Sequence, residues 1–483
     1  MSKWIHTTLN DVCLPDKGAI ISGPFGSNIS SKYFVSTGVP VIRGNNLSLT
    51  LDKFYDDGFV FVTEEKAAEL NCYAVEGDLL FTAAGTIGQV GLLEAPLTYD
   101  KYVISNKQLR ARIDTKKIDL QYAYYWFASR WMQEYFIRNN KGSTVPLISL
   151  SELKDAPISY PEVISEQKSI VAVIEALSQK IKVNNDICTE LESMAKALYD
   201  YWFTQFDFPN AEGKPYRSSG GAMEWNAQLK RKIPKGWDVR PLSYVISSIN
   251  TGLNPRDNFV LGNGVIQYLT VKNLTTSGTI DFSDCDTIDE DARSIIHKRS
   301  DISVGDILFA SIAPLGRCYL IQSIPLNWDI NESVFSIRRN ASRITSEFLY
   351  MYFMSDTFIK GATSSSTGSI FKGIRINTLL DIVAVIPPKD VVDDFTARIT
   401  KLLALKEQKA NENHELTKLR DWLLPMLMNG QATVAPASSE NVVQFPEQPE
   451  VVEVLQAARS FSDSQPTFDD TADLIRYFKE HKS

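Results

Sequence analysis

The sequence is poor in the residues that identify several classes of protein. Its 483 residues include only 5 cysteines and 4 histidines. The cysteines form no CxxC pair, which argues against a zinc site and against a disulfide framework; they are Cys13, Cys72, Cys188, Cys285 and Cys318. No two histidines lie close together, which excludes an HExxH metal site. We therefore expect reduced, buried thiols and no metal.

Long apolar runs are also missing. No stretch approaches the ~18 apolar residues that a transmembrane helix needs. The N-terminal sequence MSKWIHTTLND lacks the basic and apolar regions of a secretory signal. The sequence therefore predicts a cytoplasmic protein that does not contact the membrane.

Catalytic motifs are absent as well. The chain has no GxxxxGK[ST] phosphate loop, no GxGxxG fingerprint after a strand and no GxSxG serine elbow. It also lacks the Asn/Asp-Pro-Pro-aromatic tetrad of an amino-methyltransferase. We therefore expect no catalytic residue and no cofactor in this chain.

Charge of one sign is scarce over most of the chain. The formal net charge is −8, and residues 431–483 carry nine acidic and four basic residues, a net charge of −5. The remaining 430 residues are close to neutral. A near-neutral body can still present a basic face, so charge neither supports nor excludes binding to DNA.

What the sequence does contain is an internal repeat. VEGDLLFTAAGTIGQ (75–89) matches SVGDILFASIAPLGR (303–317) at a spacing of 228 residues. The aromatic segments 123–129 and 349–355, and the segments 142–161 and 368–387, are spaced by 226. Several ordered matches at nearly one spacing indicate a duplicated domain.

A long helical pattern follows each copy. Apolar residues recur at spacings of four and three, as in a coiled-coil seam. The seam positions are Ile170, Ile174, Leu177, Ile181, Leu191 and Leu198 in the first helix, and Phe395, Ile399, Leu402, Leu416 and Leu423 in the second. A helix of about 40 residues, about 60 Å long, with a single apolar seam needs a partner, and the other copy's helix can supply it.

Three details of these helices lead to separate expectations. Pro425 is expected to kink or end the second helix near Asp421, and Asn429-Gly430 supplies a stop. Asn184 either sets the register of the helices through a polar pair or marks a thinning of the seam. The sequence does not choose between these two roles.

The pattern predicts an α+β fold in which two similar mixed α/β domains alternate with two helices. Short β-rich runs alternate with turn signals in each copy, before one aromatic-rich helix. The predicted division is a first domain at 1–160, a helix at 161–204, a linker at 205–236, a second domain at 237–387, a helix at 388–430 and an acidic, mostly disordered tail at 431–483.

Two further motifs have a structural and a functional interpretation. Gly85–Gly88 could approach a phosphate, but the second copy has Ala313 in place of the first glycine, which favours a bulge or tight turn. The aromatic stripe at 124–131 could stack on bases, but its helical spacing favours the protein core.

A duplicated domain on paired helices suits the recognition of two sites at a fixed distance, as dimeric DNA readers do. Several motifs then carry a resemblance. LYDYWFTQFDFPNAEGKPYRSSGG (198–221), GVPVIRGNN (38–46), GDLLFTAAGTIG (77–88) and LRDWLLPMLMNG (419–430) resemble specificity subunits of type I restriction-modification enzymes. The resemblance covers about residues 7–430, in the right order and in both copies, although DVVDDF (390–395) departs from the first copy's EVISEQ.

The resemblance implies a non-catalytic subunit with two target-recognition domains joined by two long antiparallel coiled-coil helices. Each domain would read one half of an asymmetric, two-part target in double-stranded DNA. Two modification subunits that bind S-adenosylmethionine would dock on the chain and methylate adenine. Restriction subunits, which combine a motor and a nuclease and use ATP and Mg²⁺, would join them.

Candidate DNA contacts are the polar residues of loops, since readout and phosphate binding both use such side chains. In the first copy they are Gly26, Ser27, Asn28, Lys32, Arg43, Asn45, Lys141, Ser143 and Thr144. In the second copy they are Asn254, Arg256, Thr270, Lys272, Asn273, Arg317, Ser369 and Lys372. Ordinary surface polarity is the alternative explanation for each residue taken alone.

Two other functions remain open at this point. The chain could be a coiled-coil scaffold whose domains bind proteins and no DNA, which the match at 198–221 argues against. It could also be a specificity module of a related DNA-modifying defence system with different catalytic partners.

Overall fold

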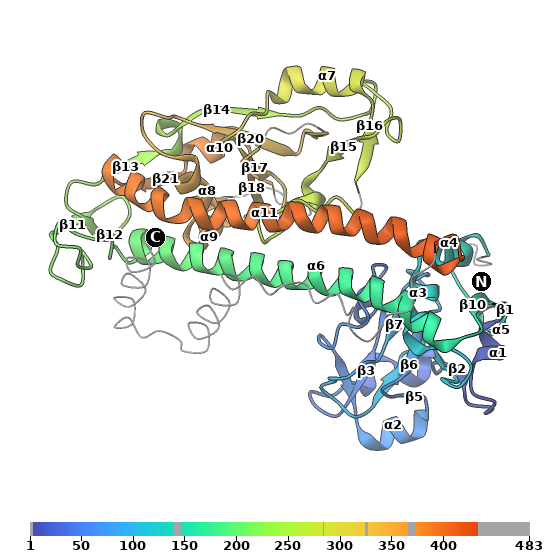
Figure 1. Cartoon of the computed structure of the whole chain (residues 1–483). Coiled ribbons are helices and arrows are strands. Elements are labelled where there is room, and N and C mark those ends of the chain that lie inside the picture. The colour runs from blue at the N-terminus through green and yellow to red at the C-terminus, as the bar shows by residue number, and fades with distance from the viewer. Residues whose placement is uncertain (1–2, 140–145, 284, 324–326, 366–372, 433–483) are drawn as a thin grey trace. The chain divides into compact units, whose positions relative to one another are not determined.

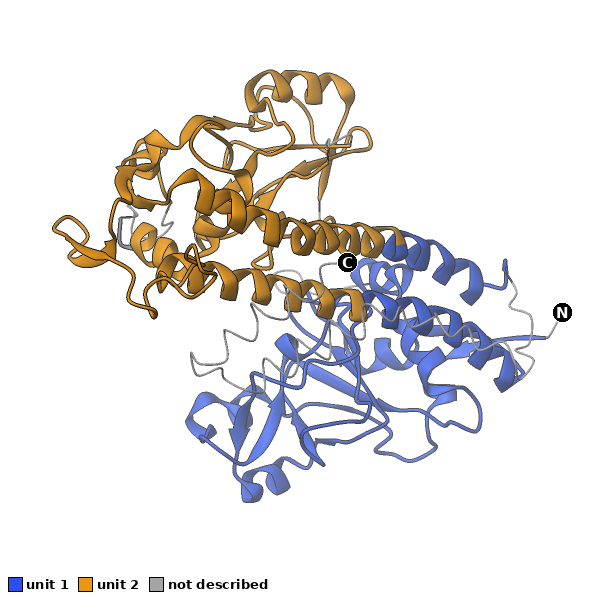
Figure 2. Ribbon diagram, turned by 60° about the vertical axis from the view of Figure 1, so that its left-hand side comes forward, with its two compact units in different colours: residues 1–181, 416–445 blue, residues 182–415, 446–483 orange. Residues whose placement is uncertain are grey.

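The computed structural model describes residues 3–139, 146–283, 285–323, 327–365 and 373–432. The chain divides into two compact units, coloured separately in Figure 2. Unit 1 comprises residues 1–181 and 416–445, and unit 2 comprises residues 182–415 and 446–483. The helices α6 (Ile164–Tyr199) and α11 (Lys389–Met428) each contribute one part to each unit.

Unit 1 is built on two four-stranded sheets. The first is antiparallel, with the order β2 (Ile20–Ser22), β9 (Gln108–Arg112), β6 (Asp78–Thr82), β7 (Val90–Leu92). The second is mixed, with β3 and β8 parallel, and has the order β4 (Val60–Val62), β3 (Val39–Ile42), β8 (Tyr102–Ile104), β5 (Tyr73–Ala74). The strands β1 (Trp4–Thr8) and β10 (Pro157–Pro161) form a separate antiparallel pair.

Unit 2 repeats this plan, except that its mixed sheet has three strands instead of four. Its antiparallel sheet has the order β14 (Ile246–Thr251), β20 (Val334–Arg339), β17 (Ile307–Ala310), β18 (Cys318–Leu320). Its mixed sheet has the order β16 (Asp286–Ile288), β15 (Ile266–Leu269), β19 (Trp328–Ile330), with β15 and β19 parallel. The strands β13 (Asp238–Pro241) and β21 (Val383–Ile386) pair as β1 and β10 do. The predicted α+β fold and its duplication are confirmed.

The helices correspond as well. Unit 1 contains α1 (Leu9–Val12), α2 (Glu64–Leu70), α3 (Leu120–Ala128), α4 (Arg130–Arg138) and α5 (Leu150–Lys154). Unit 2 contains α7 (Glu290–Ser300), α8 (Ser346–Met354), α9 (Asp356–Ser365) and α10 (Ile376–Asp381). The aromatic stripe is core as predicted, because Tyr124, Tyr125 and Phe127 of α3 are at most 1% exposed.

The repeated GDxLF motif owes its aspartate to structure. Asp78 is buried and accepts hydrogen bonds from the Val75 amide at 3.0 Å and from Arg112 Nε at 2.9 Å. Asp306 accepts the Ser303 amide at 2.9 Å and two bonds from Arg338 at 2.8 Å each. Burial raises the pKa of Asp78, and the Val75 amide and Arg112 oppose this shift. Each aspartate therefore ties a tight turn to the last strand of its sheet.

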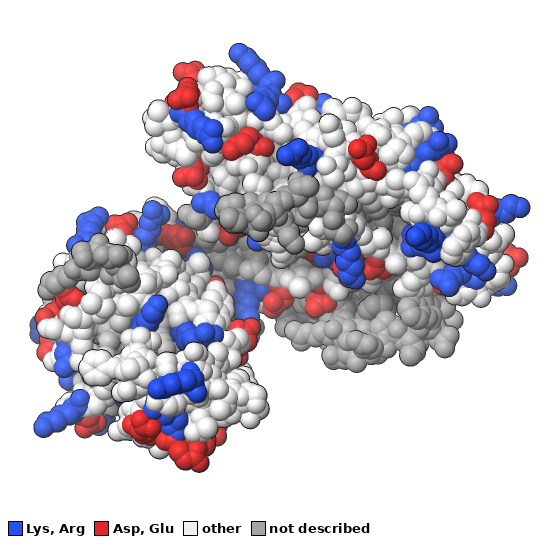
Figure 3. All heavy atoms as spheres, turned by 180° about the vertical axis from the view of Figure 1, so that it is seen from behind, with Lys and Arg blue, Asp and Glu red and all other residues white. Residues whose placement is uncertain are grey.

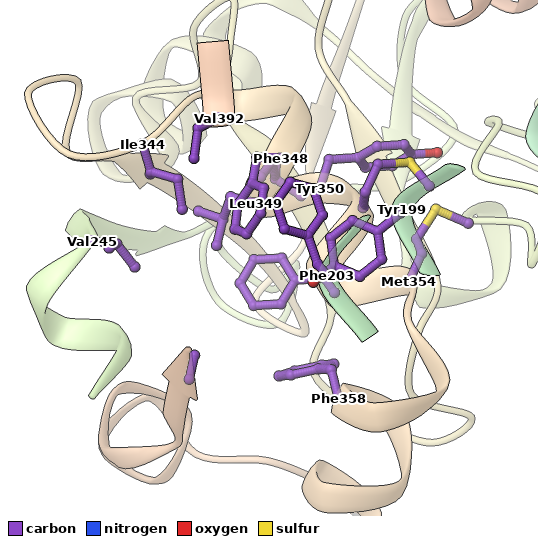
Figure 4. Close-up of a cluster of buried hydrophobic side chains, with 14 of the residues drawn as sticks. Tyr199, Phe203, Val245, Ile344, Phe348, Leu349, Tyr350, Met354, Phe358 and Val392 are labelled. Atoms are coloured by element: carbon purple, nitrogen blue, oxygen red, sulfur yellow. The ribbon is translucent and has the colours of Figure 1, made fainter. Parts of the chain in front are cut away.

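The core of unit 2 gathers side chains from distant parts of the chain. Figure 4 shows Tyr199 and Phe203 beside Phe348 and Leu349 of α8, with Val392 of α11 close by. Phe203 lies 4.7 Å from Phe348 and 4.9 Å from Phe395 between ring centroids, both in edge-to-face contact. Both long helices therefore contribute side chains to this core.

Within unit 2, α6 and α11 lie side by side and run antiparallel (Figure 1). Asn184 is buried, and its Nδ2 donates to Oδ1 of Asn413 at 2.9 Å. Lys406 Nζ, also buried, lies 3.1 Å from Glu192 Oε2. The first of the two roles left open for Asn184, a polar pair between helices, is the one observed.

The apolar seam differs from its predicted positions in the second helix. Ile170, Ile174, Leu177, Leu191, Leu198, Phe395 and Ile399 are buried as predicted. Leu402, Leu416 and Leu423 are only half-buried, as is Ile181 in the first helix. Leu403 and Leu424 take the buried positions instead. Adjacent leucines give the same periodicity, so the sequence could not tell which member of each pair faces inward.

The second helix does not end near Asp421 as one of the two expectations for Pro425 had it, because α11 continues through Pro425 to Met428. The other expectation, a kink, stays a prediction. A proline inside a helix costs about 3 kcal/mol. Burial of Leu424, Leu427 and Met428 in the core of unit 1 offsets this cost, at about 1.5–3 kcal/mol for each side chain. The chain then leaves the helix at Asn429-Gly430, as predicted, with Gly430 at φ +76°.

The segment 205–236, predicted to be a linker, is folded onto unit 2. It contains the hairpin of β11 (Met223–Asn226) and β12 (Arg231–Pro234). Phe206, Phe208 and Ile233 are buried in the core of the unit. The glycines and prolines that indicated a linker make turns, while these widely spaced apolar residues fix the segment.

Two further expectations concern the ends of the molecule and the membrane. The predicted tail lies outside the described residues except for Gln431 and Ala432. Among the described helices, none is both long and apolar enough to cross a membrane.

Candidate DNA interface

A cleft of about 370 Å³ in unit 1 collects polar side chains from three turns. One turn follows β3 and contains Arg43, Gly44 and Asn45. The second joins β6 to β7, and the third joins β8 to β9. The lining residues of these two turns are Thr82, Ala84, Gly85, Thr86 and Gln89, and Ser105, Asn106, Lys107 and Gln108. Arg43 and Asn45, predicted as DNA contacts, therefore lie in one concave site.

The turn after β3 is held from within by a buried asparagine. Asn46 Oδ1 accepts the Arg43 amide at 2.9 Å, and its Nδ2 donates to the carbonyls of Tyr55 and Asp57. Gln89 Nε2 donates to the Gly44 and Leu47 carbonyls at 3.0 and 2.9 Å. Because the backbone groups of this turn are satisfied from behind, Asn45 is left exposed at its tip.

Arg43 combines a fixed backbone with an incompletely bonded side chain. Its Nη2 donates to the Gly58 carbonyl at 3.3 Å. Its buried Nε has no hydrogen-bond partner among the described residues. A guanidinium has five donors in a planar fork, so this side chain can still bond to an acceptor that enters the cleft.

The predicted loop at 26–28 adjoins the cleft. It forms the short 3₁₀ helix η1 (Gly26–Ile29), in which Gly26, Ser27 and Asn28 are exposed. A Cβ at Gly26 would lie 3.1 Å from Nδ2 of Asn106, a residue that lines the cleft. Lys32 is exposed, and its ammonium lies 4.7 Å from the ring centroid of Tyr33.

Unit 2 builds the corresponding turn with different residues. Asn273 Oδ1 accepts the Thr270 amide at 2.9 Å, and its Nδ2 donates to the Asp281 carbonyl at 3.0 Å. Arg317 Nη1 donates to the Val271 carbonyl at 3.3 Å. This carbonyl corresponds to the Gly44 carbonyl of unit 1, which accepts from Gln89. Asn273 and Arg317 thus hold the turn together. Asn273 is buried, so it is not available at a loop tip as predicted, whereas the guanidinium of Arg317 has donors left over.

Two other predicted contacts of unit 2, Asn254 and Arg256, lie in a loop that begins with a close approach between two backbone segments. The same close approach occurs in unit 1. A Cβ at Gly252 would lie 1.7 Å from the Ile330 carbonyl oxygen, and one at Gly23 would lie 1.8 Å from that of Ser105. Only glycine fits at these two positions. Asn254 and Arg256 come two and four residues after Gly252, as Phe25 and Ser27 come two and four residues after Gly23. Arg256 is exposed. Thr270 is half-buried and Lys272 is exposed beside it.

Five predicted contacts lie outside the described residues: Lys141, Ser143, Thr144, Ser369 and Lys372. The residues that follow them are tied to the turn after β6 or β17. Ile148 N donates to Ala83 O at 2.8 Å, and Ile374 N donates to Ser311 O at 2.8 Å. The chain therefore returns to the cleft wall in unit 1 and to the equivalent turn in unit 2.

Sequence reasoning missed several lining residues. Thr86, Gln89, Asn106 and Lys107 line the cleft. Asn106-Lys107 follows an apolar strand directly, and this polar turn signal could have marked it. Phe25, at the start of η1, is 84% exposed and was not singled out.

The charged residues on the face drawn in Figure 3 do not mark a DNA-binding surface. On the face drawn in Figure 3, lysine and arginine side chains lie scattered among neutral and acidic ones. The cleft itself holds Arg43 and Lys107 and no acidic side chain among its lining residues. A polyanion that enters it therefore meets two positive charges and no carboxylate from its lining residues.

Comparison with known proteins shows which chains this one is similar to. Residues 1–193 match the family model described as type I restriction modification DNA specificity domain. The MjaIX specificity subunit of a type I restriction enzyme of Methanocaldococcus jannaschii is 25% identical over 426 residues, which are 87% of this chain and 93% of that protein. The HindI specificity subunit from Haemophilus influenzae is 21% identical over 412 residues, which are 74% of this chain and 86% of that protein.

A solved structure of the specificity subunit of a type I restriction-modification system from M. genitalium is similar over 88% of this chain and 96% of its own, with 14% identity and a TM-score of 0.49. The resemblance that the motifs carry is confirmed by the sequence matches and not by this structural similarity. The chain is thus similar to the specificity subunits of type I restriction-modification systems, over residues 1–193 for the family model and over 87% and 74% of its length for the two relatives.

Proposed function

We propose that each unit reads one half of an asymmetric, two-part target in double-stranded DNA, through the cleft in unit 1 and the equivalent turns of unit 2. The observation that carries this proposal is the pairing of one backbone plan with different side chains. Position 43 is arginine where position 270 is threonine, and position 89 is glutamine where position 317 is arginine. Equivalent loops with different donors and acceptors favour two different sequences.

The cleft suits DNA contact in two ways. Arg43, Asn45 and Asn106 can bond to acceptors and donors on base edges, whereas Lys107, Ser27 and Lys32 suit phosphate oxygens. In unit 2, Arg256, Thr270, Lys272 and Arg317 would serve the same ends. Lys141, Ser143, Thr144, Ser369 and Lys372 stay candidates from the sequence.

The chain's role is not catalytic by itself, so the chemistry belongs to its partners. We place two modification subunits, which bind S-adenosylmethionine and methylate adenine, and restriction subunits, which use ATP and Mg²⁺, on this chain. The family resemblance and the absence of catalytic motifs from the sequence support this division of labour. The chain would act in the cytoplasm, where its DNA target lies.

A genome-wide map of methylated adenines tests the proposal, with and without the gene. We expect deletion to remove methylation at one asymmetric, two-part motif. The purified complex should bind a duplex that carries this motif, with an affinity that falls steeply as salt rises. If deletion leaves the map unchanged and the purified complex shows no salt-sensitive binding to random duplex DNA, the scaffold function is favoured instead.

A further inference from the structure

Phe25 is an exposed aromatic side chain at the rim of the cleft in unit 1. It is 84% exposed, more than Trp225 at 64%. It directly precedes η1, and Ile29 at the end of η1 lines the cleft. A Cβ at Gly26 would lie 3.1 Å from Nδ2 of Asn106, which lines the cleft as well. Single exposed apolar side chains are common on protein surfaces, but this one combines its exposure with a fixed backbone and cationic neighbours.

The backbone is tethered on both sides of Phe25. Gly23 N donates to the Gln108 carbonyl at 2.9 Å, and Asn28 N donates to the Phe25 carbonyl at 2.8 Å. Gly23 also passes a second backbone segment too closely for a Cβ to fit. Between these tethers, the ring of Pro24 fixes its own φ. The aromatic ring of Phe25 is therefore presented to solvent by a backbone that has little freedom.

The groups around Phe25 indicate which kind of partner can cover it. The cleft holds Arg43 and Lys107 and no acidic side chain among its lining residues. Ser27 and Lys32, which follow Phe25 in the chain, are exposed. An apolar protein surface would leave these donors without acceptors. DNA offers phosphate oxygens to the donors and flat base faces to the aromatic ring.

Unit 2 has no aromatic side chain at the equivalent position. The close approach at Gly252 corresponds to that at Gly23, so Asn254 corresponds to Phe25. Asn254 is half-buried, and its carbonyl accepts from Nδ2 of Asn258 at 3.0 Å. The exposed ring is thus present in this loop of unit 1 and not in its counterpart, so it can act only on the half-site that unit 1 reads.

We infer that Phe25 wedges its ring between two base pairs at the edge of the half-site read by unit 1. The inference rests on the proposed function, because the cleft must receive DNA for the ring to reach the bases. Apolar side chains inserted in this way unstack a base step and kink the duplex. Burial of the ring between base faces offsets the loss of stacking, and the tethered backbone resists its closure. In this role Phe25 is a positioning residue that sets the duplex against the cleft.

The fluorescence of 2-aminopurine, which rises when this base loses its stacking, tests the inference. The purified complex of this chain with its methyltransferase subunits is bound to the motif duplex, in which 2-aminopurine replaces one adenine at a time within and beside each half-site. The half read by unit 1 is the one whose base preference R43A changes. There we expect a several-fold rise at one position other than the methylated adenine. F25A should abolish this rise and weaken binding about tenfold, whereas F25L, which keeps an apolar side chain, should retain part of the rise.

V304A is the matched control. Val304 is 53% exposed and lies in the turn before β17, at the end of that strand away from Arg317. Its truncation should leave the fluorescence and the affinity unchanged.

Two results would overturn the inference while the proposed function stands. The unchanged complex could bind its motif with no rise at any position except the methylated adenine, or F25A could keep the rise. If the unchanged complex does not distinguish its motif from random duplex, the proposed function and the inference both fail.

Discussion

Unit 1 and unit 2 use the same backbone bonds in their loops but draw them from different side chains. Gln89 ties the turn after β3 in unit 1, whereas Arg317 ties the equivalent turn in unit 2, and both donate to the same carbonyl position. Asn46 and Asn273, by contrast, are the same residue in the same role. The difference teaches that a loop can keep its shape while the groups it presents change, which is what two readers of different sequences require.

The long helices also differ between the units. In unit 1, Ile170 and Ile174 of α6 share an apolar cluster with Leu424 and Leu427 of α11. In unit 2, the contact between the helices includes Asn184 with Asn413 and Glu192 with Lys406. Apolar contacts favour association in many registers, whereas a buried polar pair favours one register. The polar layer in unit 2 therefore fixes how the helices align.

The largest expected effect comes from removing the aspartate that both units share. D78A and D306A should each destabilise the chain by about 3 kcal/mol, because each leaves a turn amide and an arginine without the carboxylate that they bond to. Urea unfolding followed by hydrogen exchange would show the loss in unit 1 for D78A and in unit 2 for D306A. The exposed Asp16 and Asp257 supply control substitutions to alanine. Equal losses from the controls would remove the structural role that we assign to the motif.

Substitutions in the two reading turns should separate the half-sites. R43A should weaken binding of the complex to its target by about 1–3 kcal/mol and relax the half read by unit 1, since Arg43 lines the cleft and its guanidinium makes one hydrogen bond there. T270A should affect the other half only. Binding to a panel of duplexes substituted one base pair at a time measures both, with exposed Lys116→Ala as control. Uniform weakening across the panel would mean that Arg43 meets phosphate.

The polar layer should show coupling between its members. N184L should cost about 1–3 kcal/mol, because it leaves Asn413 without one of its buried bonds. The double variant N184L/N413L should cost less than the sum of the single variants. Urea unfolding measures the three values, with the exposed Gln408→Ala in α11 as control. Additive losses would mean that the two asparagines act independently.

The smallest expected effect comes from exchanging Gln89 and Arg317, the side chains that hydrogen-bond to the carbonyls of the two turns. Q89A should destabilise the turn after β3 by about 1 kcal/mol, the net value of a typical hydrogen bond. Q89R and R317Q should largely preserve their turns, since either side chain can donate to the same carbonyl position. Hydrogen exchange at 44–47 and 271–274 checks this. Fast exchange in both swapped variants would show that the two ties are not interchangeable.

The sequence by itself determined the duplication, the α+β class, the paired helices and the resemblance to type I specificity subunits, because these depend on patterns repeated along hundreds of residues. GDxLF had to recur, since Gly77 and Gly305 both adopt positive φ and the aspartate after each ties its turn to the sheet. The loop at 26–28 and the turn at 43–45 were singled out from the sequence as polar segments, and their contact with DNA stays a prediction.

Only the tertiary structure decided which member of a pair is buried, which polar group is used internally and which segment is folded. Leu402 and Leu403 are equivalent in periodicity, and the contacts of α11 alone select Leu403. Asn45 and Asn273 look alike in sequence, but one is exposed at a tip and the other bonds within its turn. Pro425 stays in a helix, and 205–236 packs onto its unit, because burial of neighbouring apolar side chains outweighs the local preference. Burial is set by residues distant in the chain, which no local pattern contains.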